Sequence, residues 1–145
     1  MRIQCIHCDN WFTVKGGKAH DLYPKFCNLN CLYSYFKEKG LTDNNIWTDR
    51  ERKANMFRSQ WEVAMSKALN EMGVGFFYEA IILNFEDGSQ YLPDFYIPIE
   101  NVFIEVKGLW EPGAYSKVRK AAKLVDIWVV DEVMFKHFKL LRYLK

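Results

Sequence analysis

The sequence has no cysteine after position 31 and carries little net charge. All four cysteines fall within the first 31 residues, and the net charge of the 145 residues is only +2. The small charge excludes a histone-like polyelectrolyte, so any affinity for a polyanion must come from local basic patches. There is no internal repeat, no low-complexity tract and no apolar run that predicts a membrane span. The polar N-terminus predicts no signal peptide, and we therefore expect a cytoplasmic protein.

The four cysteines form two closely spaced pairs. Two residues separate Cys5 from Cys8, and three separate Cys27 from Cys31. In a reducing compartment, paired cysteines favour a metal site over disulfides. Four thiolates suit tetrahedral Zn²⁺, so the sequence predicts a zinc site in this segment.

The segment around the second cysteine pair predicts a small finger. Residues 32–39 predict a helix directly after Cys31. A last ligand pair at the start of a helix resembles treble-clef and related zinc fingers. The three-residue spacing between Cys27 and Cys31 leaves the subtype open. A module of this size cannot bury a core unaided, so we expect the zinc to be structural. His7 and His20 are alternative ligands, but four cysteines suffice and we expect both at the surface. A further set of side chains either contacts nucleic acid or packs the module: Lys15, Lys18, Lys25, Trp11, Phe12 and Tyr23.

Two carboxylates and a lysine lie on neighbouring predicted strands. Residues 91–97 are rich in aromatic and β-branched side chains and predict a strand that contains Asp94, and residues 98–101 predict a turn. Residues 102–107 predict the returning strand, in which Glu105 and Lys107 share one face because side chains alternate. A hairpin closing at 98–101 brings Asp94 close to Glu105. Burying these charges is costly without a metal or partners, so they are candidates for a functional site.

Pro93-Asp94 and Glu105-Val106-Lys107, followed by Gly108, resemble the motif of the PD-(D/E)XK nuclease superfamily. The resemblance covers about residues 59–131, which supply in order a Glu-bearing helix, a strand, the Pro-Asp hairpin, a second helix and a further strand. It implies an α/β fold of the restriction-endonuclease type, with a mixed central sheet flanked by helices. Here the small treble-clef-like zinc-finger module would precede that sheet.

The resemblance also implies a reaction. Asp94 and Glu105 would bind Mg²⁺, with the Val106 carbonyl as a further ligand and Mn²⁺ as an alternative ion. The cation would polarise the scissile phosphate and activate water, while Lys107 would position or deprotonate the attacking water. The implied products carry 5′-phosphate and 3′-hydroxyl ends. The alternative is a surface Glu–Lys pair beside a turn, which the adjoining apolar run disfavours.

Residues 59–72 predict an amphipathic helix that carries a third acid, Glu62. The apolar stripe of this helix is formed by Trp61, Ala64, Met65, Ala68 and Met72. By resemblance, Glu62 stands where the family has an acidic residue facing the metal. Ser59 and Glu62 also match a capping box, in which Glu62 satisfies the helix N-terminus. The two roles are compatible, and the sequence leaves both open.

Four further elements are predicted around the motif. Residues 76–85 predict a long central strand that pairs antiparallel with residues 90–97. Residues 115–124 predict a basic helix, either a phosphate-contacting surface or a solvated face. Residues 125–130 predict a buried strand parallel to the motif strand. Residues 132–145 predict a closing helix, on which we expect His137 at the surface.

These elements predict three segments: a zinc-binding finger at 1–40, a linker or connecting helix at 41–58, and a PD-(D/E)XK nuclease domain at 59–145. The expected function is that of a Mg²⁺-dependent DNA endonuclease whose structural zinc finger assists DNA binding. We expect it in the bacterial cytoplasm, or in the host cytoplasm if phage-encoded, with DNA as partner and neither a membrane nor a small-molecule substrate. One alternative is a Holliday-junction or branched-DNA resolvase of the same fold, for which a homodimer is expected. The others are an inactive zinc-dependent DNA-binding module and a protein–protein adaptor.

Overall fold

The computed structural model describes residues 1–39 and 49–144. The predicted linker at 41–58 falls partly outside these residues, and its described part contains two short 3₁₀ turns, η2 (Asp49–Glu51) and η3 (Ala54–Met56). The α-helices of the described residues are α1 (Leu29–Glu38), α2 (Gln60–Met72), α3 (Ala114–Ala122) and α4 (Glu132–His137). None of these helices is long and apolar enough to cross a membrane. The strands are β1 (Arg2–Gln4), β2 (Trp11–Thr13), β3 (Phe77–Tyr78), β4 (Leu83–Asn84), β5 (Gln90–Tyr91), β6 (Phe95–Ile97), β7 (Val102–Lys107) and β8 (Ile127–Asp131).

A mixed sheet with strand order β3-β6-β7-β8 forms the centre of the fold. β6 and β7 make the predicted antiparallel hairpin, in which Phe95 lies opposite Ile104. β8 runs parallel to β7 and is reached through α3, so that Glu105 lies opposite Val129 and Lys107 opposite Asp131. The α/β class and the mixed sheet are therefore confirmed, as is the predicted parallel strand after the motif.

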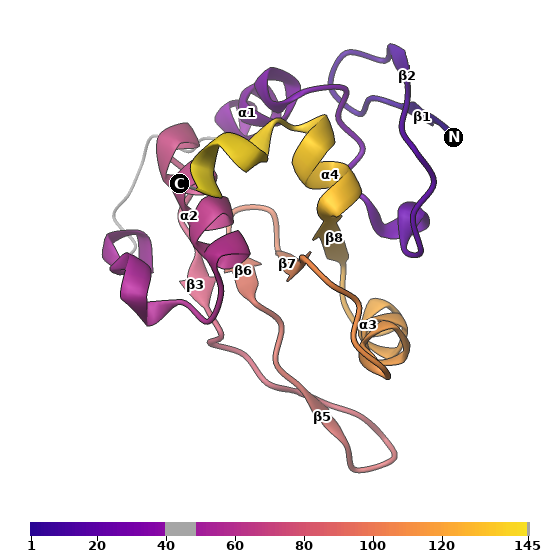
Figure 1. Cartoon of the computed structure of the whole chain (residues 1–145), viewed down its shortest axis with the longest axis vertical. Helices are drawn as coiled ribbons and strands as arrows, with labels where there is room; N and C mark the ends of the chain where they lie inside the picture. The colour runs from indigo at the N-terminus through magenta and orange to yellow at the C-terminus, as the bar shows by residue number, and fades with distance from the viewer. Residues whose placement is uncertain (40–48, 145) are drawn as a thin grey trace.

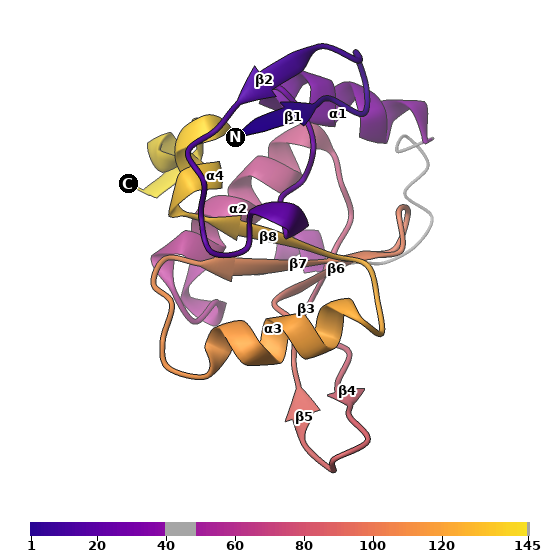
Figure 2. The ribbon, with the colours of Figure 1, turned by 90° about the vertical axis from the view of Figure 1, so that its right-hand side faces the viewer.

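Helices cover both faces of this sheet. Figure 2 shows α2 and α4 on one face and α3 on the other, while the β4–β5 ribbon projects away from the body. β7 is buried along almost its whole length, and the side chains around it come from α2, α3 and the neighbouring strands. α2 begins at the N-cap Ser59 and ends at Gly73, whose positive φ of 78° closes the helix in the left-handed conformation. The predicted helix at 59–72 is thus confirmed.

The prediction of one long central strand at 76–85 is wrong. Only Phe77–Tyr78 and Leu83–Asn84 are strands, and they belong to different sheets, with β3 at the edge of the main one. Between them Glu79 takes a positive φ of 48°, while its N–H donates to the Asp94 carbonyl at 2.9 Å. A residue in this conformation ends a strand, so the chain leaves the sheet here. The same break divides predicted strand 91–97 into β5 and β6, and Asp94 lies between them.

The closing helix is shorter than predicted, and the environment of His137 differs from the prediction. α4 ends at His137, and a 3₁₀ turn, η4 (Leu140–Leu144), follows Lys139, whose φ of 58° interrupts the helix. His137 is half-buried rather than at the surface. Its Nε2 lies 2.9 Å from the Phe26 carbonyl oxygen, and its ring stacks on Phe12 at 4.8 Å. The reason is that the N-terminal segment packs over α4.

The N-terminal segment shares a continuous apolar core with the rest of the chain. β1 and β2 pair as a hairpin, and α1 follows the second cysteine pair (Figure 1). Phe26 and Phe36 pack against Trp128 of β8, with ring centroids 5.8 and 6.1 Å away. The Arg119 guanidinium of α3 pairs with both carboxylate oxygens of Asp21, which fixes the segment on a second side. The cysteine segment is therefore held against the sheet rather than tethered to it.

Candidate active site and metal centre

The four cysteines meet at one point. Their Sγ atoms all lie within 4.8 Å of one another, with 3.6 Å between Cys8 and Cys27 and 3.4 Å between Cys27 and Cys31. A tetrahedron with Zn–S bonds of about 2.3 Å places sulfurs roughly 3.8 Å apart, so the cluster fits a zinc ion. Burial raises the pKa of the Cys5 thiol, but backbone amides of Cys8, Cys27 and His7 outweigh this effect and lower it to about 6. A thiolate ligand is thus favoured at Cys5.

Local sequence explains how the cysteines converge. Cys5 and Cys8 stand on the turn between β1 and β2, which Asp9 closes with a φ of 65°. Asn28 is the N-cap of α1, and its Oδ1 accepts from the Cys31 N–H at 2.9 Å. Cys31 therefore lies in the first helical turn, as the finger-like pattern predicts. His20 is exposed and His7 contacts Glu38, so neither histidine belongs to the cluster.

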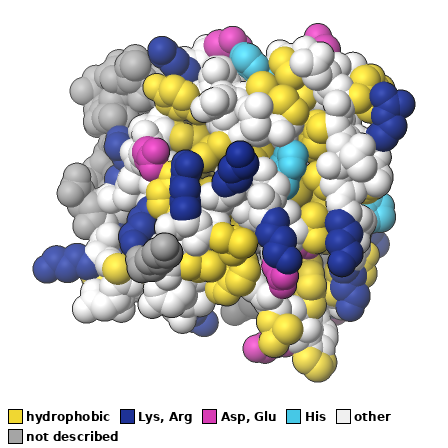
Figure 3. All heavy atoms as spheres, turned by 45° about the horizontal axis from the view of Figure 1, so that its top comes forward, with side chains coloured by type: hydrophobic (Ala, Val, Ile, Leu, Met, Phe, Trp, Pro, Cys, Tyr) yellow, Lys and Arg dark blue, Asp and Glu magenta, His cyan; other side chains and the backbone are white. Residues whose placement is uncertain are grey.

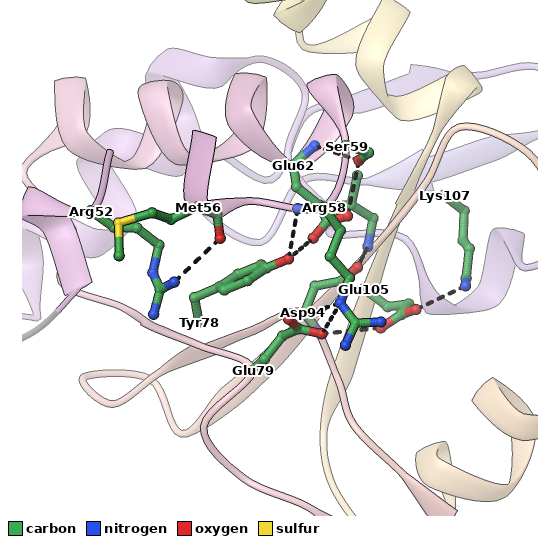
Figure 4. A network of polar contacts seen from close by, with 11 residues as sticks. Arg52, Met56, Arg58, Ser59, Glu62, Tyr78, Glu79, Asp94, Glu105 and Lys107 are labelled. Carbon is green, nitrogen blue, oxygen red and sulfur yellow. Dashed lines mark hydrogen bonds and ion pairs between the residues drawn. The ribbon is translucent and has the colours of Figure 1, made fainter. Parts of the chain in front are cut away.

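Asp94 and Glu105 meet in a cleft of about 830 Å³ that is lined by the start of α2, the end of β7 and the start of α3. The Val106 N–H donates to Asp94 Oδ2 at 2.7 Å, and the Asp94 N–H donates to Glu105 Oε1 at 3.3 Å. Lys107 Nζ lies 3.0 Å from Glu105 Oε2. Figure 4 shows Lys107 reaching Glu105 from the end of β7. The structure therefore brings together the two acids and the lysine of the motif.

The electrostatics of this cleft disfavour two free carboxylates. Burial raises the pKa of Asp94 to about 9, with added repulsion from Glu105 and Glu62, while the Val106 N–H and Lys107 act in the opposite direction. Burial also raises the pKa of Glu105, which is only 3% exposed, and Lys107 again opposes the shift. A cation between the carboxylates would relieve both effects, because it replaces repulsion with attraction. The oxygen donors are those that Mg²⁺ prefers.

Ser59 caps the start of α2 at Glu62, and the Glu62 side chain faces the cleft. The Glu62 N–H donates to Ser59 Oγ at 3.2 Å, and Ser59 Oγ donates to Glu62 Oε2 at 2.9 Å. The other oxygen accepts a hydrogen bond from the Tyr78 hydroxyl, as Figure 4 shows. Glu62 lines the cleft, and its charge is among the causes that raise the pKa of Asp94.

The structure adds neighbours that sequence reasoning did not select. The hydroxyl of Tyr91 is buried beside the acids, and burial together with the charge of Glu105 raises its pKa. Arg58 Nε pairs with Glu79 Oε2 at 2.9 Å, and both residues line the cleft. No signal in the sequence distinguishes Tyr91 from the other aromatic residues, because its role depends on the sharp bend at 92–94.

Gly108 has a packing reason to follow the lysine of the motif. A Cβ on Gly108 would lie 2.8 Å from Nε1 of Trp61 and 2.9 Å from two carbons of the same ring. Real Cβ atoms essentially never approach so closely, so the indole of α2 requires a glycine here. Trp61 in turn packs on Phe135, with ring centroids 4.4 Å apart. This contact fixes the start of α2, and with it Glu62, relative to the end of β7.

The basic side chains of α3 lie in two different environments. Arg119 pairs with Asp21, and Lys120 Nζ lies 2.7 Å from Asp87. Lys117 instead lines the active-site cleft. Part of the charge of α3 is therefore structural, and part faces the acids.

A sequence model of the family described as phage endonuclease I matches residues 44–127, more than half of the chain.

The chain belongs to the phage endonuclease I family.

Two relatives of the phage endonuclease I family match it over similar lengths. It is 35% identical over 85 residues to Endonuclease I of Escherichia phage T7, which covers 54% of this chain and 56% of that protein. It is 41% identical over 80 residues to Endodeoxyribonuclease 1 of Enterobacteria phage T3, which covers 51% and 52%. The chain thus spans about half the length of the curated relatives it matches. No solved structure matches it.

The phage endonuclease I match divides the two candidate sites. Glu62, Asp94, Glu105 and Lys107 all lie within residues 44–127. The four cysteines lie before that region. The acid site thus belongs to the part of the chain that defines the family, while the cysteine cluster lies outside that part.

Proposed function

We propose that this chain is a cation-dependent DNA endonuclease of the PD-(D/E)XK type with a restriction-endonuclease-like fold. The observation that carries the proposal is the position of half-buried Asp94 beside buried Glu105, with Lys107 Nζ 3.0 Å from Glu105. Family membership and the T7 relative support endonuclease activity, and the T3 relative, Endodeoxyribonuclease 1, supports DNA as the substrate.

Asp94 and Glu105 would hold the cation, and the Val106 carbonyl is a further candidate ligand. A bound Mg²⁺ or Mn²⁺ supplies Lewis-acid chemistry at the phosphate and activates water. The lysine ammonium, held by Glu105, is placed to orient the attacking water and to stabilise the charge that builds on the phosphate oxygens. Glu62 would act on this centre through a water, since Mg²⁺ retains several of its own. The proposed products carry 5′-phosphate and 3′-hydroxyl ends.

The cysteine cluster would hold a structural zinc ion. Four thiol ligands leave no open position, which is typical of structural rather than catalytic zinc. In this proposal the module is a finger that assists DNA binding, and its metal orders the loops around it. The treble-clef subtype and the boundary at residue 40 belong to the same proposal.

The proposal is tested by cleavage of supercoiled plasmid, linear duplex and a four-way junction. The protein is assayed in metal-depleted buffer and with added Mg²⁺ or Mn²⁺, without chelator, so that zinc stays on the cysteines. We expect cutting only with added cation. Lys107→Ala should reduce the rate by about 10²–10⁴-fold, the range for a positioned proton-transfer group. Asp94→Ala should abolish the cation response.

Lys37→Ala is the matched control, since this exposed lysine of α1 does not line the cleft that contains the acids. It should cut at the wild-type rate. Cutting without added cation, or full activity of Asp94→Ala, would overturn the mechanism. The ends are checked by ligation of the products, which requires a 5′-phosphate and a 3′-hydroxyl.

The branched-DNA resolvase remains the alternative within the same fold. It is selected if the four-way junction is cut and the linear duplex is not. Light scattering on the same preparation tests the homodimer that this alternative expects. A protein that binds duplex DNA but cuts no substrate with any cation would instead support the inactive DNA-binding module.

A further inference from the structure

A second groove joins the active-site cleft at the end of β7. Its volume is about 690 Å³, and three consecutive residues, Lys107, Gly108 and Leu109, line both the groove and the cleft. The far wall of the groove is the loop at 13–18, which follows β2 in the cysteine segment. Figure 2 shows this indigo loop running down beside the end of β8 to the turn η1 (His20–Leu22). The cysteine segment and Lys107 therefore line the same groove, next to the active-site cleft.

The groove carries more positive than negative charge. Its lining includes the lysines Lys15, Lys18, Lys107 and Lys136 and the acids Asp131 and Glu132. Asp131 is buried and accepts from the Tyr23 hydroxyl, and Glu132 pairs with Lys136 at 2.8 Å. Among residues 1–39 and 49–144, neither Lys15 nor Lys18 forms a salt bridge. Lys18 lies over the Tyr115 ring at 5.3 Å, a contact that keeps its positive charge, so neither loop lysine is neutralised by a carboxylate of the described residues.

The exposed surface over the cysteine segment and α4 has a matching character. Figure 3 shows Lys and Arg side chains interleaved with apolar ones on this face, with few acidic side chains between them. In the groove itself, Leu109 is 77% exposed. The Lys107 ammonium lies over the indole of Trp110, 5.9 Å from the centroid of the ring. Basic side chains beside exposed apolar surface suit the sugar-phosphate backbone of a nucleic acid.

Close packing at Gly17 holds the loop at this wall. A Cβ on Gly17 would lie 1.9 Å from the Tyr23 hydroxyl oxygen and 3.1 Å from Asp131 Oδ2. The Tyr23 hydroxyl donates to that same carboxylate at 2.6 Å. The loop between Lys15 and Lys18 therefore passes directly over a hydrogen bond that links the cysteine segment to β8.

We propose that this groove holds the sugar-phosphate backbone of the cleaved DNA strand on one side of the scissile phosphate, with Lys15 and Lys18 as its phosphate contacts. The inference rests on the proposed endonuclease function and adds a role for the cysteine segment. The acids of the cleft repel a phosphate chain, so the strand must be held by positive charge beside them. Lys15 and Lys18 supply that charge from outside the region that matches the family.

The test measures binding rather than cutting. A fluorescein-labelled DNA duplex is titrated with protein carrying Asp94→Asn, and the affinity is followed by anisotropy across a series of KCl concentrations. Lys15→Ala with Lys18→Ala should make the slope of log affinity against log salt shallower by about two. At 0.1 M salt the affinity should fall roughly tenfold per lysine, independent of DNA sequence.

The matched control is Lys37→Ala with Lys39→Ala, which removes the same charge from the end of α1, away from the groove. Its salt slope should stay near that of the parent protein. Equal salt slopes for the two double variants would reject the proposal that this groove binds DNA, even if the enzyme cuts DNA. A salt slope that depends on Lys15 and Lys18, in a protein that cuts no DNA, would support DNA binding in the groove and reject the proposed endonuclease function.

A charge-neutral pair of variants tests the position of the loop. Gly17→Ala should weaken duplex binding, because the new Cβ meets the Tyr23 hydroxyl and displaces the loop. Adding Tyr23→Phe removes that oxygen and should restore part of the affinity. Zinc content and circular dichroism are measured on each variant. Unchanged affinity of a Gly17→Ala protein would argue against the loop as a wall, and if this variant fails to fold, the lysine variants decide.

Discussion

The two candidate metal sites of this chain are built on opposite principles. The cysteine cluster is closed, with four sulfurs within 4.8 Å of one another at the junction of a hairpin and a helix. The carboxylate cleft is open, with about 830 Å³ in front of Asp94 and Glu105. A closed set of four ligands leaves a metal no position for substrate, whereas two acids at the edge of a cleft leave several. The first arrangement stabilises structure, and the second leaves room for a reaction.

The comparison extends to how each site is held. The cysteines lie on short elements that the metal itself would link together. The acids instead lie on and beside β7, the most buried strand of the sheet, so their positions depend on the core rather than on the ion. Loss of metal should therefore unfold the cysteine cluster and leave the carboxylate cleft folded. Three measurements bear on this difference.

The largest effect should come from the cysteines. Cys31→Ser removes a ligand from the first turn of α1, and binding of structural zinc supplies about 10–16 kcal/mol in isolated fingers at neutral pH. We expect loss of bound zinc, early proteolysis within residues 1–39 and a lower melting temperature. His20→Ala is the control, since this exposed side chain lies outside the cluster. Full zinc content in the Cys31→Ser protein would contradict a four-cysteine site.

A smaller effect should separate the two roles of Glu62. Glu62→Gln keeps an amide oxygen that can accept from Tyr78 and an amide NH₂ that can donate to Ser59 Oγ, but it loses the charge that faces the acids. We expect cleavage to fall about 10–100-fold with little change in stability, since a positioned group acting through water contributes at the low end of its range. Ser59→Ala should do the reverse, lowering stability by about 1 kcal/mol as an N-cap loss. The two are compared by cleavage rate and urea denaturation, and an inactive Ser59→Ala protein with normal stability would reverse the assignment.

The smallest effect concerns stability of the open site without added cation. Burial raises the pKa of Asp94 to about 9 in the folded protein, against about 4 in an unfolded chain, so between these pH values the carboxyl takes up a proton on folding. Its contribution to stability is complete below pH 4 and is lost progressively as pH rises towards 9. Asp94→Asn should therefore stabilise the cation-free protein by about 1–2 kcal/mol at pH 8 and less at pH 6, measured by urea denaturation. Added Mg²⁺ should stabilise the wild type and not the variant. A variant less stable than the wild type at pH 8 would count against buried repulsion at this site.

Much of the main sheet and of both sites follows from local patterns. The alternation in residues 102–107 is enough to identify a strand with Glu105 and Lys107 on one face. Ser59, Glu62 and Gly73 mark the ends of α2, because capping and left-handed closure depend on neighbouring residues alone. Cysteine spacing is similarly local, and the sulfurs do converge. These predictions succeed because each depends on short-range geometry.

The failures have a common cause in long-range contacts. Residues 76–85 have the composition of a central strand, yet Glu79 leaves the sheet where its N–H bonds to the Asp94 carbonyl. His137 has no local reason to be half-buried, and is covered by Phe12 from the other end of the chain. In both cases a distant partner outweighs the local preference, which spans only about 1 kcal/mol for strands.

The sequence alone determined the chemistry that is present: two acids and a lysine at hairpin spacing, and four thiols in two close pairs. Alternation and capping place these groups, because they act over a few residues. Only the tertiary structure decided the environment of these groups. Burial raises the pKa of Asp94, and the Trp61 indole requires a glycine at position 108. The lysines of the cysteine segment line the same groove as Lys107. These depend on which distant surfaces pack together, and packing is settled by the whole core rather than by any one segment.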